Sequence, residues 1–429
     1  MKSRLTLLGM ALLAVGFAVL AAGCGAASSA PPAAASARTS SPARSAVAAT
    51  NPAPASVGTG STPTARAGAG TKCAGPPTGD VDSATGQVPV PALDALQFVS
   101  ASQGWAVGAG RVLATSNGGQ TWTRQYSGAA ELDQVDFIDA RHGWAAGTDS
   151  LLRTTDGGAT WTAAGDPCGA IRSVHFVTPD VGYAVAAGSQ VRIDGGLPAP
   201  VVGGELLATT NGGQSWAAVP AAPAQAQTAC FTSTSSGFLG TPGKIWRTSD
   251  GGRTWSLAFT EPAASGGARP GPADTTLVEC AGGSAVWAMF LGSGAALGHA
   301  PYLAYGTQNA ATMHALFEEA YIESAIRPQV HAPDGPGSYP GPFSAISPDA
   351  AVFVGFDPAV GYGAVPLMTV AGGGLHAQGD VSGISQAYGA AFVSATQGWV
   401  VGKNLQSGNY AIEATTDGGH TWTRQYQTS

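Results

Sequence analysis

Charged side chains are scarce in this sequence: Asp, Glu, Lys and Arg together make up 10% of its 429 residues, well below the usual quarter or so. A coiled coil is excluded, because heptad repeats need far more charge than this. Nucleic-acid binding is not expected either, because 19 basic residues face 26 acidic ones without any basic cluster. Long apolar runs are lacking after the first 24 residues, which excludes a protein with several membrane-spanning helices.

Motifs that carry chemistry are equally scarce. The five cysteines include no Cys-x-x-Cys pair, and the seven histidines show no metal-ligand spacing. Glycine pairs occur in hairpin turns rather than at the strand–helix junctions where phosphate loops form. The sequence therefore predicts no metal, no cofactor and no catalytic residue.

Glycine and proline, by contrast, are abundant, with 62 and 29 residues. Glycine is about twice as frequent as usual. This composition favours many short strands joined by tight turns over a bundle of helices.

The N-terminus is typical of a secretory signal. Lys2 and Arg4 precede a mostly apolar stretch. The stretch ends in Leu20-Ala21-Ala22-Gly23-Cys24, which resembles a bacterial lipobox. The resemblance implies that residues 1–23 are a lipoprotein signal peptide and that Cys24 carries the lipid, which places the protein at the extracytoplasmic face of the bacterial membrane. An ordinary secretion signal with a chance cysteine is the alternative.

Residues 24–72 are rich in Ala, Ser, Pro and Gly and contain no acidic side chain. Such a segment cannot bury enough apolar surface to fold, so it is predicted to be a disordered tether. Residues 73–429 hold all 26 acidic residues and 13 of the 19 basic ones, a net charge of −13. This acidic body favours a basic or neutral partner.

One octapeptide, Thr-[Ser/Thr]-[Asp/Asn]-Gly-Gly-x-[Thr/Ser]-Trp, occurs five times in the body of the chain. Its Asp or Asn position and its Trp position are occupied by Asn117 and Trp122, Asp156 and Trp161, Asn211 and Trp216, Asp250 and Trp255, and Asp417 and Trp422. Asp or Asn followed by Gly-Gly suits a tight turn, because glycine accepts positive φ without steric cost. We expect these tryptophans to pack in turns and core rather than to stack on a ligand, and Trp246 beside the fourth box to pack as well.

Two further elements precede most boxes. One is a Gly-Trp-Ala-Val-Gly run such as Gly104–Gly108, and the other is a run around Phe such as Leu96–Val99. Weaker copies of the box at 306–313 and 369–376 raise the number of units to seven, across about residues 91–427. The pattern of each unit predicts four short strands joined by turns. Residues 73–429 are therefore predicted to form an all-β fold, a single seven-bladed β-propeller of four-stranded antiparallel blades.

The octapeptide resembles the Asp-box, or BNR repeat, of sialidases, sortilin-type receptors and the photosystem II assembly and stability factor family. The pairing of Gly-Trp-Ala-Val-Gly with Thr-Thr-Asp-Gly-Gly-x-Thr-Trp is most similar to the last family. That resemblance implies a non-catalytic scaffold that binds a membrane or secreted protein partner during assembly, with the box residues in structural roles. Nothing in the sequence itself indicates photosynthesis.

A glycan-directed function is the alternative, either as a sialidase-like hydrolase or as a propeller that binds a cell-wall polysaccharide. A sialidase needs an arginine cluster and a Tyr–Glu pair, but its Phe/Tyr-Arg-Ile-Pro motif is absent. The nearest string, Val191-Arg192-Ile193-Asp194, lacks the proline. The acidic stretch that begins at Glu318 is expected to be an exposed strand or short helix. The sequence thus favours a protein that is not an enzyme.

With Cys24 assigned to the lipid, four cysteines remain, and they allow three pairings. Cys230 and Cys280 are predicted to lie in the first strands of neighbouring blades and are therefore a plausible disulfide, which would leave Cys73 to pair with Cys168.

Three irregular inserts, at about 187–204, 258–273 and 325–342, are candidate recognition loops on the rigid propeller, with neutral insertion as the open alternative. His175 alternates with core residues and is expected to face the central channel.

Overall fold

The structure, a computed structural model, describes residues 92–428 apart from 130, 149, 166, 168, 188–203, 263–274, 283–284, 293–301, 307–312, 319–331 and 358–362. The expected signal peptide and tether, with Cys24 and Cys73, lie outside the described residues, as does Cys168. None of the described residues belongs to a helix long and apolar enough to cross a membrane.

The described residues form seven sheets, each of four consecutive strands paired antiparallel. Blades one and two contain β1 (Ala95–Phe98), β2 (Gly104–Gly108), β3 (Arg111–Thr115), β4 (Thr123–Ser127), β5 (Gln134–Phe137), β6 (Gly143–Gly147), β7 (Ser150–Thr154) and β8 (Thr162–Ala163). Blades three and four contain β9 (Ala170–Phe176), β10 (Gly182–Ala187), β11 (Glu205–Thr209), β12 (Ala217–Ala218), β13 (Thr228–Phe231), β14 (Gly237–Thr241), β15 (Lys244–Thr248) and β16 (Ser256–Thr260). Blades five to seven contain β17 (Thr275–Cys280), β18 (Val286–Leu291), β19 (Tyr302–Gly306), β20 (His314–Glu318), β21 (Tyr339–Ser347), β22 (Ala350–Phe356), β23 (Pro366–Ala371), β24 (Gly374–Asp380), β25 (Gln386–Phe392), β26 (Gly398–Lys403), β27 (Tyr410–Thr415) and β28 (Thr423–Gln427).

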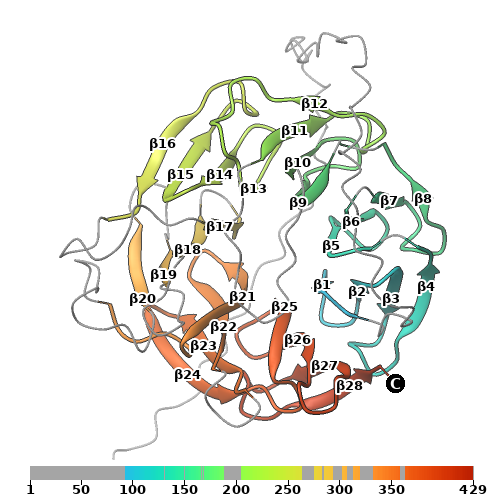
Figure 1. The fold of residues 1–429 in the computed structure, drawn as a ribbon, viewed down its shortest axis with the longest axis vertical. Helices are drawn as coiled ribbons and strands as arrows, with labels where there is room; N and C mark the ends of the chain where they lie inside the picture. The colour runs from blue at the N-terminus through green and yellow to red at the C-terminus, as the bar shows by residue number, and fades with distance from the viewer. Residues whose placement is uncertain are drawn as a thin grey trace, which may run out of the picture. The chain divides into compact units, whose positions relative to one another are not determined.

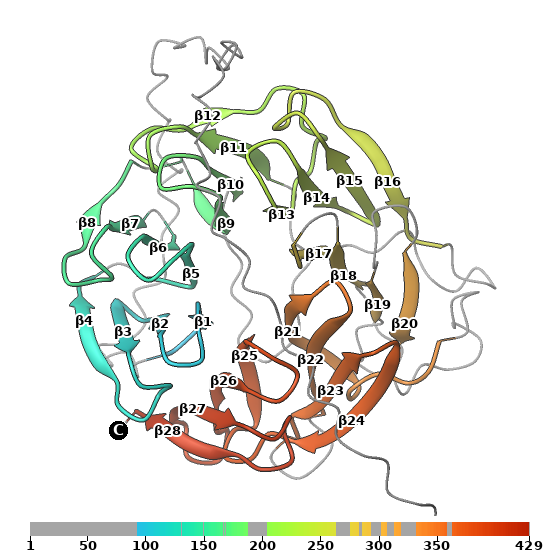
Figure 2. The ribbon, with the colours of Figure 1, turned by 180° about the vertical axis from the view of Figure 1, so that it is seen from behind.

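The seven blades follow one another around a central axis, with the first strand of each blade innermost and the fourth strand on the perimeter (Figures 1 and 2). This confirms the predicted seven-bladed all-β propeller. The last blade supplies all four of its own strands, β25 to β28, so blades one and seven close the ring without sharing a strand.

The second strands form the buried middle of the blades, and their sequence explains why. Every residue of β2, Gly-Trp-Ala-Val-Gly, is buried. A Cβ atom on Gly104 would lie 2.6 Å from the Phe98 ring, so glycine is needed for β1 and β2 to approach this closely. The fourth strands are largely exposed, as in β4, which accounts for their polar sequences.

The box closes the turn between strands three and four through a fixed set of hydrogen bonds. In blade two, Thr154 Oγ1 accepts from the Gly158 N–H (2.8 Å) and donates to Asp156 Oδ1 (2.8 Å), while Asp156 Oδ1 accepts from the Thr160 N–H (2.9 Å). Gly157 and Gly158 have φ of 74° and 90°, which favours glycine at both positions. The hydrogen bonds to the Asp156 carboxylate lower its pKa from 3.8 to about 2, and the bond from the Thr160 hydroxyl has the largest effect.

The box also joins neighbouring blades, in addition to closing its own turn. The indole N–H of Trp144 in β6 donates to the Gly212 carbonyl in the box of blade three, at 3.0 Å. The Trp144 ring stacks on Phe176 of β9, with centroids 3.5 Å apart. The equivalent stacked pairs at other joints are Trp399–Phe98, Trp105–Phe137 and Tyr183–Phe231.

Candidate functional site

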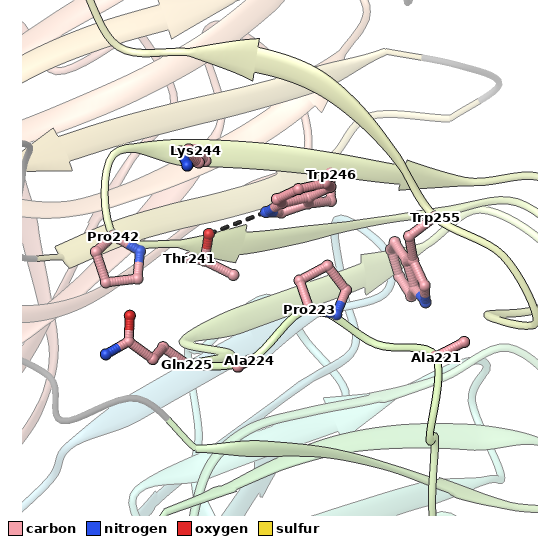
Figure 3. Close-up of a pocket in the computed structure, with 9 residues that line it drawn as sticks. All are labelled: Ala221, Pro223, Ala224, Gln225, Thr241, Pro242, Lys244, Trp246 and Trp255. Atoms are coloured by element: carbon pink, nitrogen blue, oxygen red, sulfur yellow. Dashed lines mark hydrogen bonds between the residues drawn. The ribbon is translucent and has the colours of Figure 1, made fainter.

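The first strands of all seven blades line a central channel of about 560 Å³. A separate hollow of about 450 Å³ lies on blade four, lined by β14, β15 and the link from blade three (Figure 3). The channel is the candidate functional site, because ionisable side chains from several blades meet there: Asp136 is buried, and His175 and Glu279 are partly buried. Loops and channel mouths of rigid scaffolds are also the usual places for recognition.

Polar side chains cross from blade to blade at one level of the channel. Gln97 Oε1 accepts from the Phe137 N–H at 2.5 Å, and Asp136 Oδ2 accepts from the Phe176 N–H at 2.6 Å. Next around the ring, the His175 Nε2–H group donates to the Phe231 carbonyl at 2.7 Å. These residues occupy one register position, each opposite the aromatic residue of strand two in its own blade.

The remaining blades also have a residue at this register position. Glu279 Oε2 accepts from the Ala345 N–H at 2.8 Å, and Ser344 Oγ accepts from the Phe392 N–H at 3.0 Å. We call this level the channel belt; its members are Gln97, Asp136, His175, Cys230, Glu279, Ser344 and Ala391. Ala391 has no polar atom in its side chain, so the joint between blades seven and one lacks a side-chain bridge of this kind.

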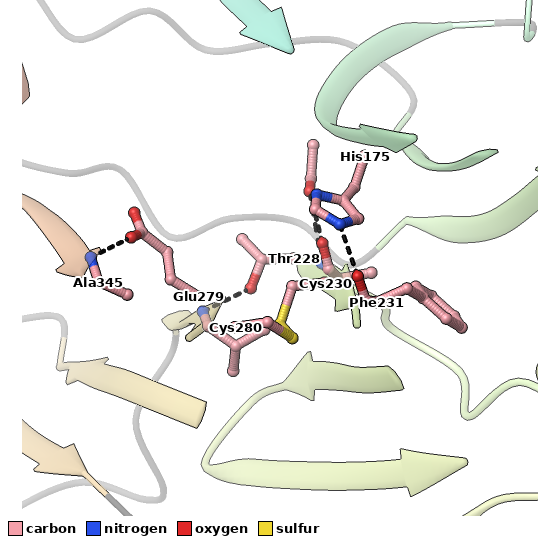
Figure 4. The surroundings of a disulfide bond; sticks show 10 residues. His175, Thr228, Cys230, Phe231, Glu279, Cys280 and Ala345 are labelled. Carbon is pink, nitrogen blue, oxygen red and sulfur yellow. Dashed lines mark hydrogen bonds between the residues drawn. A yellow bond between two sulfur atoms is a disulfide. The ribbon is translucent and has the colours of Figure 1, made fainter. Parts of the chain in front are cut away.

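A disulfide provides the bridge between blades four and five. Cys230 and Cys280 are bonded, with their Cα atoms 5.6 Å apart (Figure 4). Cys280 stands where blades one to four and seven have Phe, since it lies opposite Val286 at the start of β18. The covalent link therefore lies at a joint where a Trp–Phe stack cannot form.

Burial raises the pKa of two channel carboxyls. Glu279 has its pKa raised from 4.5 to about 7 by desolvation, which the Ala345 N–H opposes. Desolvation likewise raises the pKa of Asp136 above 3.8, against the charge of His175 and the hydrogen bond from Phe176. Around neutral pH the charge of the channel therefore depends on pH.

One end of the channel lining carries further charges. Asp94, Asp133 and Arg172 lie four residues before the Phe of their strands. Burial lowers the pKa of Arg172, and Asp133 opposes this shift. Among the described lining residues, the carboxylates Asp94, Asp133, Asp136 and Glu279 outnumber the basic groups Arg172 and His175.

The structure places some of the residues that the sequence analysis named in the channel and others away from it. His175 lines the channel as predicted, whereas none of the box Asp, Asn and Trp residues is among the lining residues that the structure describes. The expectation for Glu318 was wrong: it ends β20 with a fully buried side chain, packed inside the blade rather than exposed. Most of the first two inserts, residues 188–203 and 263–273, lies outside the described residues, as do residues 325–331 of the third.

Sequence reasoning missed the channel belt. Five of its members directly precede the Phe of strand one, whereas Glu279 precedes Cys280 and Ser344 precedes Ala345. The side chains differ so much that the sequence alone shows no conserved pattern at this position. The signal that could have found it is the register: at most of these positions a polar residue alternates with buried ones and must face the axis.

Comparisons with known proteins agree with this architecture. The profile of the family described as photosynthesis system II assembly factor YCF48 matches residues 125–273. No curated protein sequence matches the chain. A solved GH74 xyloglucanase from Xanthomonas campestris is similar with a TM-score of 0.51 and 15% identity, over 78% of this chain and 54% of the xyloglucanase. This chain thus spans about half the length of that enzyme.

A structure described as YCF48 bound to a D1 peptide is similar with a TM-score of 0.46 and 17% identity, over 73% of this chain and 91% of the other. Together, the repeat, the fold and the family profile define the class: this chain is a BNR-type seven-bladed β-propeller. Within that class, the match to the YCF48 assembly factors covers blades two to four and the end of β4.

Proposed function

We propose that this protein is a membrane-anchored, extracytoplasmic propeller that binds a protein partner as a scaffold or assembly factor and has no catalytic role. The observation that carries the proposal is the acidic channel. Its carboxylates Asp136 and Glu279 and the imidazole of His175 hold neighbouring blades together. Side chains held by such hydrogen bonds stiffen the wall of the channel rather than form a nucleophile–base pair, and Asp94 and Asp133 at the channel end add negative charge.

The charge of the channel indicates the chemistry of the partner. An acidic lining within a body of net charge −13 attracts basic segments and repels anionic polymers. We therefore expect a basic segment of the partner to dock at the channel end near Asp94, Asp133 and Arg172. The match to a family of assembly factors supports a protein as the partner.

A glycan-active hydrolase is less well supported. Arg172 is the single arginine among the channel-lining residues that the structure describes, whereas a sialidase requires several arginines around the substrate carboxylate. No observation in the channel favours this alternative over partner binding.

The proposal is tested by crosslinking the tagged protein in its native membranes, purifying it, and analysing bound proteins and glycans by mass spectrometry. One enriched membrane or secreted protein with a basic exposed segment is the expected result. Trimmed polysaccharide without a protein partner would contradict the proposal. In the same cells, Cys24→Ser should move the protein from the membrane to the aqueous fraction if Cys24 bears the lipid.

A further inference from the structure

Blade four differs from its neighbours at one position of its third strand. Leu113, Leu152 and Leu207 occupy this position in blades one to three and are 3%, 7% and 7% exposed. In blade four the position holds Trp246, opposite Leu239 of β14, and its larger side chain is only half-buried. Trp246 packs against the core of its blade as expected, and the part of its ring that stays exposed is free for a further contact.

Trp246 forms one wall of the blade-four hollow. Figure 3 shows its indole ring across the hollow from Ala224 and Gln225, with Pro223 and Trp255 at one side and Pro242 at the other. The volume of about 450 Å³ falls within the usual range for small-molecule sites. Concave, mostly apolar walls with a few polar groups are the general pattern of such sites.

Both indole N–H groups of the hollow are already used within the protein. Trp246 Nε1 donates to Thr241 Oγ1 at 3.0 Å, and Trp255 Nε1 donates to the Gly252 carbonyl at 3.1 Å. The aromatic walls thus offer ring surface rather than hydrogen-bond donors to a ligand. Ring surface of this kind suits a ligand that lays a flat face on the indole.

Two side chains supply the polar contacts at the edge of the hollow. Gln225 has a φ of 63°, an unusual conformation for a residue other than glycine, and such strain often accompanies ligand contacts. Lys244 is exposed and is the one ionisable residue of the lining. An amide and an ammonium group can both hydrogen-bond hydroxyl groups.

We propose that this hollow binds a neutral saccharide, with the Trp246 indole stacked on a sugar ring and Gln225 and Lys244 bonded to its hydroxyl groups. The net charge of −13 on residues 73–429 disfavours an acidic polysaccharide. The site is separate from the channel and independent of the protein partner, so either proposal can fail without the other.

The test uses the full chain, purified in detergent, and isothermal titration with cellotetraose, chitotetraose and mannotetraose. Polygalacturonate and a proline decapeptide serve as the acidic and peptidic probes. Trp246→Leu restores the residue of blades one to three, and Gln225→Gly removes the amide while accepting the positive φ, so both variants should fold. Leu257→Ser is the matched control, because Leu257 pairs with Trp246 and is 49% exposed but does not line the hollow.

We expect at least one neutral tetrasaccharide to bind, with about tenfold weaker binding for both Trp246→Leu and Gln225→Gly and unchanged binding for Leu257→Ser. Binding of none of the three tetrasaccharides would overturn the proposal. So would equal affinities of the wild type and Trp246→Leu, or binding of only the decapeptide or polygalacturonate.

Discussion

At the scale of single residues, one register position holds seven different amino acids, and six of them bridge to the neighbouring blade. The channel belt places Gln97, Asp136, His175, Cys230, Glu279, Ser344 and Ala391 between neighbouring blades. Amide, carboxylate, imidazole, hydroxyl and disulfide groups can all reach the adjacent strand. The chemistry of each joint therefore varies while the geometry of the blades is kept.

Glu279 is expected to make folding depend on pH. Its pKa is raised from 4.5 to about 7 in the folded protein, so the folded state binds more protons than the unfolded state between these values. Stability must therefore fall as pH rises from about 4.5 to 7, by up to roughly 3 kcal/mol. Glu279→Gln keeps an acceptor for the Ala345 N–H and should remove this dependence, as measured by urea unfolding at pH 5 and pH 8.

The matched control for this experiment is Glu205→Gln, because Glu205 begins β11 and is exposed. It should change the urea midpoints at pH 5 and pH 8 equally. If Glu279→Gln were no more stabilising at pH 8 than at pH 5, the buried carboxylate would not have the raised pKa that we assign to it.

The box Asp residues should behave in the opposite way. Hydrogen bonds from Thr160 lower the pKa of Asp156 from 3.8 to about 2, so its contribution is complete above about pH 4 and is lost as pH falls toward 2. Asn117 accepts from the Thr121 N–H in the same way with an amide oxygen. Thermal melting at pH 7 should therefore tolerate Asp156→Asn, whereas Asp156→Ala should lower the melting temperature; equal losses in both variants would contradict this.

At the scale of blades, the joints divide into two kinds. Stacked aromatic pairs join blades seven to one, one to two, two to three and three to four. The Cys230–Cys280 disulfide and the Glu279 and Ser344 hydrogen bonds join the remaining blades. The joints of the second kind flank blades five and six, whose copies of the box are weak.

The joint between blades seven and one offers a way to add a bridge. Ala391 lines the channel, and Phe98 occupies the place that Phe137 has at the next joint. Ala391→Gln should supply the acceptor that Gln97 supplies to Phe137, and should stabilise the fold by about 1 kcal/mol. Ala391→Met is the control, because it has similar length without an acceptor; equal melting temperatures for the two variants would argue against the bridge.

At the scale of the whole molecule, the repeats predicted the propeller, because each unit carries its own turn chemistry and strand pattern. The boxes at Asn117, Asp156, Asn211, Asp250 and Asp417 mark five blades, and the weaker copies at 306–313 and 369–376 bring the number to seven. The channel belt and the blade-four hollow could not be predicted in this way. The belt depends on contacts between residues 40 to 66 positions apart, such as Gln97 with Phe137 and Glu279 with Ala345. The hollow depends on how residues 221–225 lie against β14 and β15.

The central claim is that the channel end binds a protein partner. It is tested most directly by placing a photo-crosslinking amino acid at Gln134, which lines the channel, and for comparison at Gln120, which is exposed in the box of blade one. After irradiation in native membranes, we predict one protein adduct at Gln134 that is absent at Gln120 and weakens at high salt, because the contact is electrostatic. Identical adducts at both positions, or none at Gln134, would contradict partner binding at the channel.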